Sequence, residues 1–164
     1  MTDGELALRP ATQADAPLLT AWDAQPHVKA SDPDTDGDWA EDLAHPLPGY
    51  TYLLAEVAGT PIGCVLVLDP AQDPTQYWGP VVPGYRALDT WIGPPEYLGR
   101  GYGTRMLRLV VADCFADPTV RAIWVDPLRS NTRAHRFYQR LGFVPVGERV
   151  FGEEVCLVHV LERP

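Results

Sequence analysis

Apolar side chains recur along the chain at two different periods, and each period predicts a different kind of element. Period-two or continuous apolar runs, bounded by Gly and Pro, predict six to seven strands. A 3.6-residue period predicts about four helices. The expected strands lie near residues 5–9, 50–59, 61–70, 85–93, 120–127, 143–152 and 154–163. The expected helices lie near residues 12–22, 39–44, 102–115 and 131–142.

Local signals refine these elements. Thr12 is suited to N-cap the first helix, with Asp15 at the capping-box spacing. A turn over residues 59–61 joins two apolar runs into a hairpin. Residues 23–49 are expected to be irregular apart from the short helix near 39–44. The order β-α-β-β-β-α-β-α-β-β predicts an α/β (α+β) fold with a mixed sheet covered by helices.

Length and composition indicate one domain over residues 1–164, with 46% hydrophobic residues available for a core. The three cysteines are widely separated and form no CxxC motif, so we expect no metal site and a reducing compartment. The N-terminal residues show no signal-peptide pattern, and no apolar run approaches membrane-spanning length. The expectation is a cytoplasmic protein without membrane contact.

The charge distribution divides the chain. The net charge is −9, but residues 96–149 carry nine of the thirteen basic residues and only five acids, which makes that segment +4 and the remainder −13. One part is suited to an anion and the other to a cation. Chance asymmetry on solvated faces is the alternative. An acidic chain of this kind is a poor candidate for binding nucleic acid.

The stretch "YLGRGYGTRML" places Gly99, Gly101 and Gly103 between a strand and a helix. A glycine-rich loop there directs backbone N–H groups at an anion such as a diphosphate, and the helix dipole assists. A Walker loop is excluded because Thr104 and Arg105 follow the last glycine. A dinucleotide fingerprint is excluded because its third glycine is missing. A tight packing turn remains the alternative.

A second motif, "NTRAHRFYQRLGF", follows with Asn131, Ala134, Tyr138 and Gly142. Together the two motifs resemble the GCN5-related N-acetyltransferase (GNAT) superfamily. The resemblance implies a mixed, mostly antiparallel sheet that splays in the middle, and acetyl-coenzyme A as cofactor. One departure is Leu98, where the family usually has Gln or Arg.

The resemblance also implies which residues hold the cofactor. Backbone N–H groups of the glycine loop would bind the pyrophosphate, the strand end would pair with the pantetheine, and nearby arginines would meet phosphates. Asn131 would bond the pantetheine amides, although a helix N-cap is its structural alternative. The implied cofactor-binding residues are Trp91, Ile92, Gly99, Arg100, Gly101, Tyr102, Gly103, Thr104, Asn131, Ala134 and Tyr138, with Arg133 and Arg140 as further phosphate partners.

Two residues are predicted to be catalytic. The resemblance places Tyr138 beside the cofactor sulfur, where a phenol can protonate the leaving thiolate; a core tyrosine is the alternative. The stretch "YRALDTWIG" looks most like the aminoglycoside 6′-N-acetyltransferase branch, which has an Asp in this strand, here Asp89. A carboxylate entering the cofactor slot can accept a proton from the attacking amine, directly or through water, or hold the ammonium in place. An exposed strand residue, or a salt bridge to Arg86, is the alternative.

On the acceptor side, the resemblance implies Asp126, because "VDPLRSN" matches the Asp-Pro of the same branch. Further candidates are Trp78 and an acidic stretch over residues 27–42 that includes Asp34 and Asp36. Asp126 precedes a proline and could be only a turn residue. The acidic stretch suits a cationic acceptor, with a solvated loop as the alternative; a calcium loop lacks the required Glu.

The resemblance leaves three functions open: acetylation of a cationic small-molecule amine, acetylation of a protein or peptide, or non-enzymatic binding of acyl-coenzyme A. The first is preferred. Its expected partner is a small-molecule amine, and the expected state is a monomer or homodimer.

Overall fold

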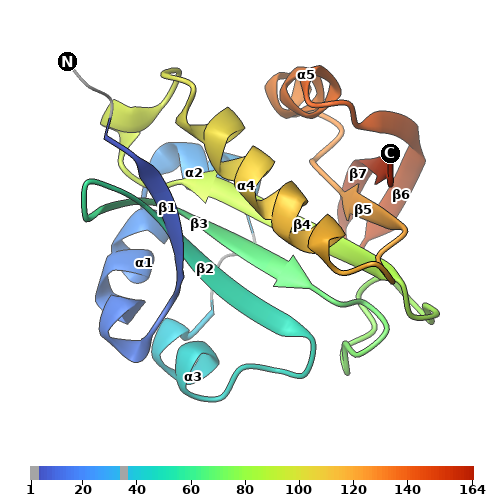
Figure 1. The fold of residues 1–164 in the computed structure, drawn as a ribbon, viewed down its shortest axis with the longest axis horizontal. Coiled ribbons are helices and arrows are strands. Elements are labelled where there is room, and N and C mark those ends of the chain that lie inside the picture. The colour runs from blue at the N-terminus through green and yellow to red at the C-terminus, as the bar shows by residue number, and fades with distance from the viewer. Residues whose placement is uncertain (1–3, 34–36) are drawn as a thin grey trace.

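The computed structural model of the chain describes residues 4–33 and 37–164 and is shown in Figure 1. Seven strands form one sheet in the order β1-β2-β3-β4-β5-β7-β6. The strands are β1 Leu6–Pro10, β2 Tyr50–Val57, β3 Thr60–Leu68, β4 Tyr85–Ile92, β5 Ala122–Val125, β6 Val144–Phe151 and β7 Glu154–Glu162. Every neighbouring pair is antiparallel except β4 and β5. The expected mixed, mostly antiparallel sheet is confirmed.

Five α-helices lie within the described residues: α1 Ala16–Asp23, α2 Pro26–Ser31, α3 Trp39–Ala44, α4 Tyr102–Ala116 and α5 Thr132–Arg140. Short 3-10 turns precede α1 and α4, at Gln13–Asp15 and Pro95–Tyr97. None of these helices is long and apolar enough to cross a membrane.

Three details differ from the sequence prediction. The stretch expected to be irregular contains α2, whose first residue is Pro26. The helix expected from Thr12 starts instead with a 3-10 turn and reaches Asp23. The hairpin turn is formed by Ala58 and Gly59, both with positive φ, so residues 60 and 61 already belong to β3. Two positive φ values are what a two-residue hairpin turn requires, because they match the twist of the strands.

One face of the sheet is covered by α1, α2 and α3. Leu19 and Trp22 of α1 are buried against Leu54 of β2 and Cys64 of β3. The end of β4 also approaches this layer closely, because a Cβ added to Gly93 would lie 2.0 Å from the ring of Trp22. Only glycine allows that approach, which fixes α1 against the far end of β4.

The opposite face is covered by α4, which crosses the front of the sheet in Figure 1, and by α5. Met106, Leu107 and Val110 of α4 are buried with Val65 of β3 and Leu88 of β4. Successive residues of a strand point to opposite faces, so Val65 faces α4 and the preceding residue, Cys64, faces α1. Burial on both faces holds β3 and β4 rigidly, and β4 carries the site described next.

Candidate functional site

Strands β4 and β5 separate part-way along their length and leave a slot between them. Their parallel pairing ends at Ala87 and Trp124. Beyond that point β4 stays paired with β3 as far as Ile92, while β5 continues beside β7. The backbone groups that β4 directs toward β5 therefore lose their strand partner, within the described chain, along the length of the slot. The splay implied by the sequence is present.

The sheet register decides which residues of β4 present their backbone to the slot. The N–H of Gly93 donates to the carbonyl of Ile62 at the start of β3. Trp91, two residues before Gly93, lies opposite Cys64 of β3. Positions two apart in an antiparallel ladder have the same orientation, so the backbone of Trp91 is directed at β3. The backbones of Thr90 and Ile92 are directed at the slot. Of the two residues expected to pair with pantetheine, Ile92 is therefore correctly oriented and Trp91 is not.

A cavity of about 450 Å³ opens beside the slot and is lined by α2, the end of β4, the glycine loop and α5. Gly99 and Gly101 have φ of +67° and +83°, and a Cβ added to Gly101 would meet no atom within 4 Å. The first intrahelical bond of α4 joins the N–H of Arg105 to the carbonyl of Gly101. The N–H groups of residues 102–104 thus precede the helical bonding, and no described side chain caps them.

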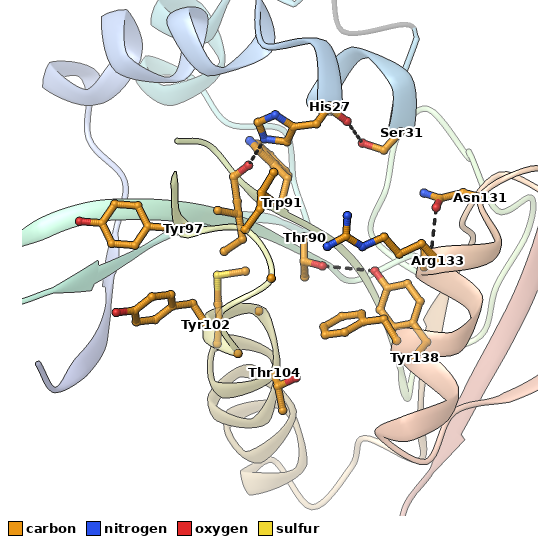
Figure 2. A pocket seen from close by; sticks show the side chains of 18 of the residues that line it. His27, Ser31, Thr90, Trp91, Tyr97, Tyr102, Thr104, Asn131, Arg133 and Tyr138 are labelled. Carbon is orange, nitrogen blue, oxygen red and sulfur yellow. Dashed lines mark hydrogen bonds between the residues drawn. The ribbon is translucent and has the colours of Figure 1, made fainter. Parts of the chain in front are cut away.

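Open space above free N–H groups at a helix N-terminus fits a diphosphate. Two arginines, Arg133 and Arg140, line the same cavity from α5. Arg133 is directed toward the slot in Figure 2. Arg100 is exposed, donates to the carbonyl of Glu96 at 3.3 Å, and does not line the cavity. Its guanidinium instead lies 5.6 Å from the ring centre of Tyr102.

Asn131 and Ala134 line this cavity at the start of α5. The Oδ1 atom of Asn131 accepts a hydrogen bond from the Ala134 N–H at 3.1 Å, which confirms the N-cap alternative. Because the capping side chain also lies on the cavity wall, a helix cap and a cofactor contact are compatible at this position.

Tyr138 stands between two cavities and lines both. Its ring is buried, with 7% of the residue exposed, and packs on Phe143. Its hydroxyl is 3.2 Å from the hydroxyl of Thr90, a bond that joins α5 to β4 across the slot in Figure 2. Burial raises the pKa of Tyr138, so the phenol stays protonated at neutral pH. Tyr138 is therefore packed in the core and also lines the slot between the two cavities.

The second cavity, of about 720 Å³, adjoins the first on the far side of Tyr138 and Thr90. Among the described residues its wall contains no Lys, Arg or His side chain. Six carboxylates line it: Asp23, Asp32, Asp42, Asp89, Asp126 and Glu154. The predicted acceptor residues Asp34 and Asp36 lie outside the described residues.

Asp89 and Asp126 occupy matching positions at the mouth of the slot. Asp89 lies in β4 and Asp126 directly follows β5, each two residues beyond the last paired positions, Ala87 and Trp124, and both line the acidic cavity. Asp89 is exposed to the cavity, but surrounding protein limits its hydration. The low hydration of the Asp89 carboxylate, and then the negative charges of Asp126 and Asp32, raise the pKa of Asp89. Burial also raises the pKa of Asp126.

Two structural alternatives for these aspartates are wrong. Arg86 pairs with Asp69 at 3.4 Å and Asp117 at 3.5 Å, so it does not neutralise Asp89. Asp126 is more than a turn residue, because its Oδ2 accepts a hydrogen bond from the Tyr77 hydroxyl at 2.6 Å.

Aromatic residues complete the wall of the acidic cavity. Trp78 lines it as predicted, although only 6% of the residue is exposed, and its ring packs between Trp124 and Phe151. Trp39 and Tyr52 form an edge-to-face pair, with ring centres 5.4 Å apart, in the same cavity. Such faces suit the apolar rings and ammonium groups of an organic cation.

The sequence analysis missed several residues of the two cavities. The Nε2 atom of His27 donates to the Ile92 carbonyl at 2.8 Å, and this bond holds α2 against the first cavity. Thr90 holds the Tyr138 hydroxyl. The period-two pattern could have placed Thr90 on the face opposite Asp89, but only the tertiary fold brings α2 to β4.

Comparison with known proteins agrees with this geometry. The family model for the acetyltransferase (GNAT) domain matches residues 11–151. Aminoglycoside N(6′)-acetyltransferase type 1 of Klebsiella pneumoniae is 43% identical over 61 residues, which are 37% of this chain and 30% of the relative. The kanamycin resistance protein of Rhizobium radiobacter is also 43% identical over 61 residues, 37% of this chain and 56% of that protein. The matched stretch thus spans about a third to a half of these relatives.

Solved structures match over nearly the whole chain. Aminoglycoside acetyltransferase AAC(6′)-Ib in complex with coenzyme A has a TM-score of 0.87 at 28% identity, covering 97% of this chain and 95% of that chain. The same enzyme with coenzyme A and kanamycin has a TM-score of 0.86 at 29% identity, with the same coverage.

Proposed function

The chain belongs to the GNAT acetyltransferase family, and we propose that it transfers the acetyl group of acetyl-coenzyme A to a primary amine of a cationic, aminoglycoside-like small molecule. The observation that carries the proposal is the meeting of two chemically opposite cavities at one pair of hydroxyls. The first cavity is lined by two arginines and suits an anion, and the charged residues described in the wall of the second cavity are all acidic. Thr90 and Tyr138, joined through their hydroxyls, line both cavities.

The all-acidic lining is what supports a cationic acceptor. Six carboxylates without a compensating base among the described lining residues attract a molecule that carries several ammonium groups. The solved relative with coenzyme A and kanamycin supports the same class of acceptor. The acids come from α1, α3, β4 and β7 and from the segments after α2 and β5, so they surround the cavity and favour a compact molecule over an extended peptide.

The first cavity fits coenzyme A. The N–H groups of residues 102–104 and the side chains of Arg133 and Arg140 would hold its phosphates, and the slot-facing backbone of Thr90 and Ile92 would hold the pantetheine. When bound, acetyl-coenzyme A supplies an activated acetyl group on a thioester. The protein's contribution is to bring that group and the amine together without an acyl-enzyme, which places both in one orientation before reaction.

The nitrogen loses two protons, one when the ammonium becomes a neutral nucleophile and one when the amide forms, and the leaving thiolate takes up one. Asp89 accepts the proton that the ammonium loses, directly or through a cavity water, and a carboxylate whose pKa lies above its usual range does so better than an ordinary one. Tyr138 is protonated at neutral pH and gives a proton, or a hydrogen bond, to the departing sulfur. The C–N bond forms as the C–S bond breaks, and one net proton is released to solvent.

An acceptor panel tests the proposal. Kanamycin, spermidine and a lysine-containing peptide are each incubated with acetyl-coenzyme A, and free thiol is followed while the acetylated product is identified by mass spectrometry. We expect kanamycin to be acetylated most efficiently. Acetylation of the peptide alone would move the function to protein acetylation. Coenzyme A binding without acetylation of any amine would contradict an enzymatic role on these acceptors.

A further inference from the structure

The two aspartates at the mouth of the slot are not equivalent, because among the described residues a side chain donates a hydrogen bond to Asp126 and none donates to Asp89. The Tyr77 hydroxyl donates to Oδ2 of Asp126 at 2.6 Å. No donor of the described chain lies within hydrogen-bonding distance of the Asp89 carboxylate, which faces the cavity. Asp89 and Asp126 line the same cavity, and the charge of Asp126 raises the pKa of Asp89, as expected of two carboxylates that share a site and do not both ionise freely.

We infer that Tyr77 is a positioning residue that gives the two aspartates different roles. It keeps Asp126 ionised as the anion that holds the substrate ammonium, and it leaves Asp89 as the group that takes a proton from that ammonium. The inference rests on the proposed amine acetylation. A hydrogen bond to the charged form of an acid favours that form, so the first proton that enters the pair goes to Asp89.

Tyr77 is held for this purpose by three contacts. Its ring is stacked on Phe151, with centres 4.5 Å apart and planes 7° from parallel. The edge of Trp78 meets it at 5.9 Å. Its backbone N–H donates to the buried carboxylate of Asp73 at 3.2 Å, and Asp73 also orders the turn by accepting from Thr75. A ring fixed this firmly, on a residue that is 46% exposed, presents its hydroxyl to Asp126 before any ligand arrives.

Among the other charged groups near Asp126, Arg149 acts in the same direction as Tyr77, whereas Asp32 acts on both aspartates alike. Asp32 follows α2 and raises the pKa of both aspartates. Arg149 on β6 lowers the pKa of Asp126, but its Nη2 is bonded to the Trp78 carbonyl at 2.9 Å. Cys156 on β7 is buried, and its pKa is raised, so the thiol is neutral near pH 7. The direct side-chain bond from Tyr77 therefore distinguishes Asp126 from Asp89, together with the Asp126 backbone N–H and the charge of Arg149.

The test is a titration of aspartate carboxyl carbons by NMR in protein labelled at that position, which needs no substrate. Asp89→Asn and Asp126→Asn assign the two signals. We expect Asp126 to titrate below Asp89 in the natural protein. Tyr77→Phe keeps the ring and should raise the Asp126 midpoint by about one pH unit, the size expected of one hydrogen bond to a carboxylate. Tyr85→Phe, a hydroxyl loss on β4 outside both cavities, should leave both midpoints in place.

Kinetics on a verified acceptor provide the second readout. Tyr77→Phe should lower kcat/KM on the acid side of the pH profile, because Asp126 then stays protonated to a higher pH, and kcat/KM should recover at higher pH. Adding Tyr77→Phe to Asp126→Asn should produce no further shift. If the Asp126 midpoint does not move in Tyr77→Phe, the inference is wrong, whether or not the protein acetylates amines. If the midpoint moves but no acceptor is acetylated, the proposed function fails while the role of Tyr77 in the pair stands.

Discussion

Gly101 gives the sharpest test of the glycine loop, because Gly59 provides a matched control. Their φ values are +83° and +80°, and a Cβ added to either would meet no atom within 4 Å. A side chain at these positions is strained to a similar degree, about 1–2 kcal/mol, without an internal clash. Gly101→Val and Gly59→Val should therefore lose similar stability, equivalent to a few degrees in Tm. They differ in place, since Gly59 lies in the hairpin turn between β2 and β3 and Gly101 opens onto the cofactor cavity.

The affinity for coenzyme A should separate the two variants. Gly101→Val fills space that a diphosphate needs and keeps it from one or two N–H groups. Each hydrogen bond to a charged group contributes about 1.5–3 kcal/mol, so the affinity should fall by about tenfold to a hundredfold or more. Gly59→Val should bind as the natural protein does. Calorimetry on proteins whose melting is checked first gives both numbers. Equal affinities in two folded variants would refute the assignment of the loop.

Three further outcomes are expected. Tyr138→Phe should lower kcat by about 10²–10⁴-fold while the affinity for coenzyme A holds, and an unchanged kcat with chemistry rate-limiting would leave Tyr138 as a core residue only. The activity of the natural protein should fall as the pH drops and Asp89 becomes protonated, and Asp89→Asn should be poorly active at neutral pH but recover in part toward the amine pKa of about 10.4. The pKa of Asp15 is lowered to about 2 by its bond to Arg9, so its contribution to folding is complete above its ordinary pKa and is lost as the pH falls toward 2. Asp15→Asn should therefore cost about 1–2 kcal/mol at pH 7, after allowance for solvent screening, and almost nothing at pH 2, as denaturant titrations at both pH values would show.

The parts of the fold that the sequence predicted are those where a local signal and the tertiary packing agree. The short helix α3 was predicted with its observed bounds, and Asp38 caps it by accepting from the Glu41 N–H at 3.2 Å. The helix α2 was missed because six residues starting with a proline give too short a pattern to detect. Its place is fixed instead by a buried Val28 and by the bond from His27 to β4, which depend on the folded sheet.

The candidate site also has parts that a local motif predicts and parts that depend on the tertiary fold. Tyr138 and Asp89 were predicted from motifs; Tyr138 lines both cavities, and Asp89 lines the acidic one. The prediction that Arg100 meets a phosphate stays a prediction, because its exposed side chain donates to the Glu96 carbonyl and no sequence pattern fixes the direction of a basic residue in a glycine loop. The contact between Tyr77 and Asp126 joins residues 49 positions apart. No local pattern predicts such a contact, since it depends on how the loop before β4 folds over the end of β5.

The most direct test of the central claim is to identify the product formed from kanamycin and acetyl-coenzyme A. The protein is incubated with both, and the small molecules are separated and examined by NMR. The account predicts one equivalent of free coenzyme A for each molecule of kanamycin that carries an acetyl group on a primary amine, with the rate strongly reduced in Asp89→Asn. Free coenzyme A accompanied by acetate and unchanged kanamycin would contradict it.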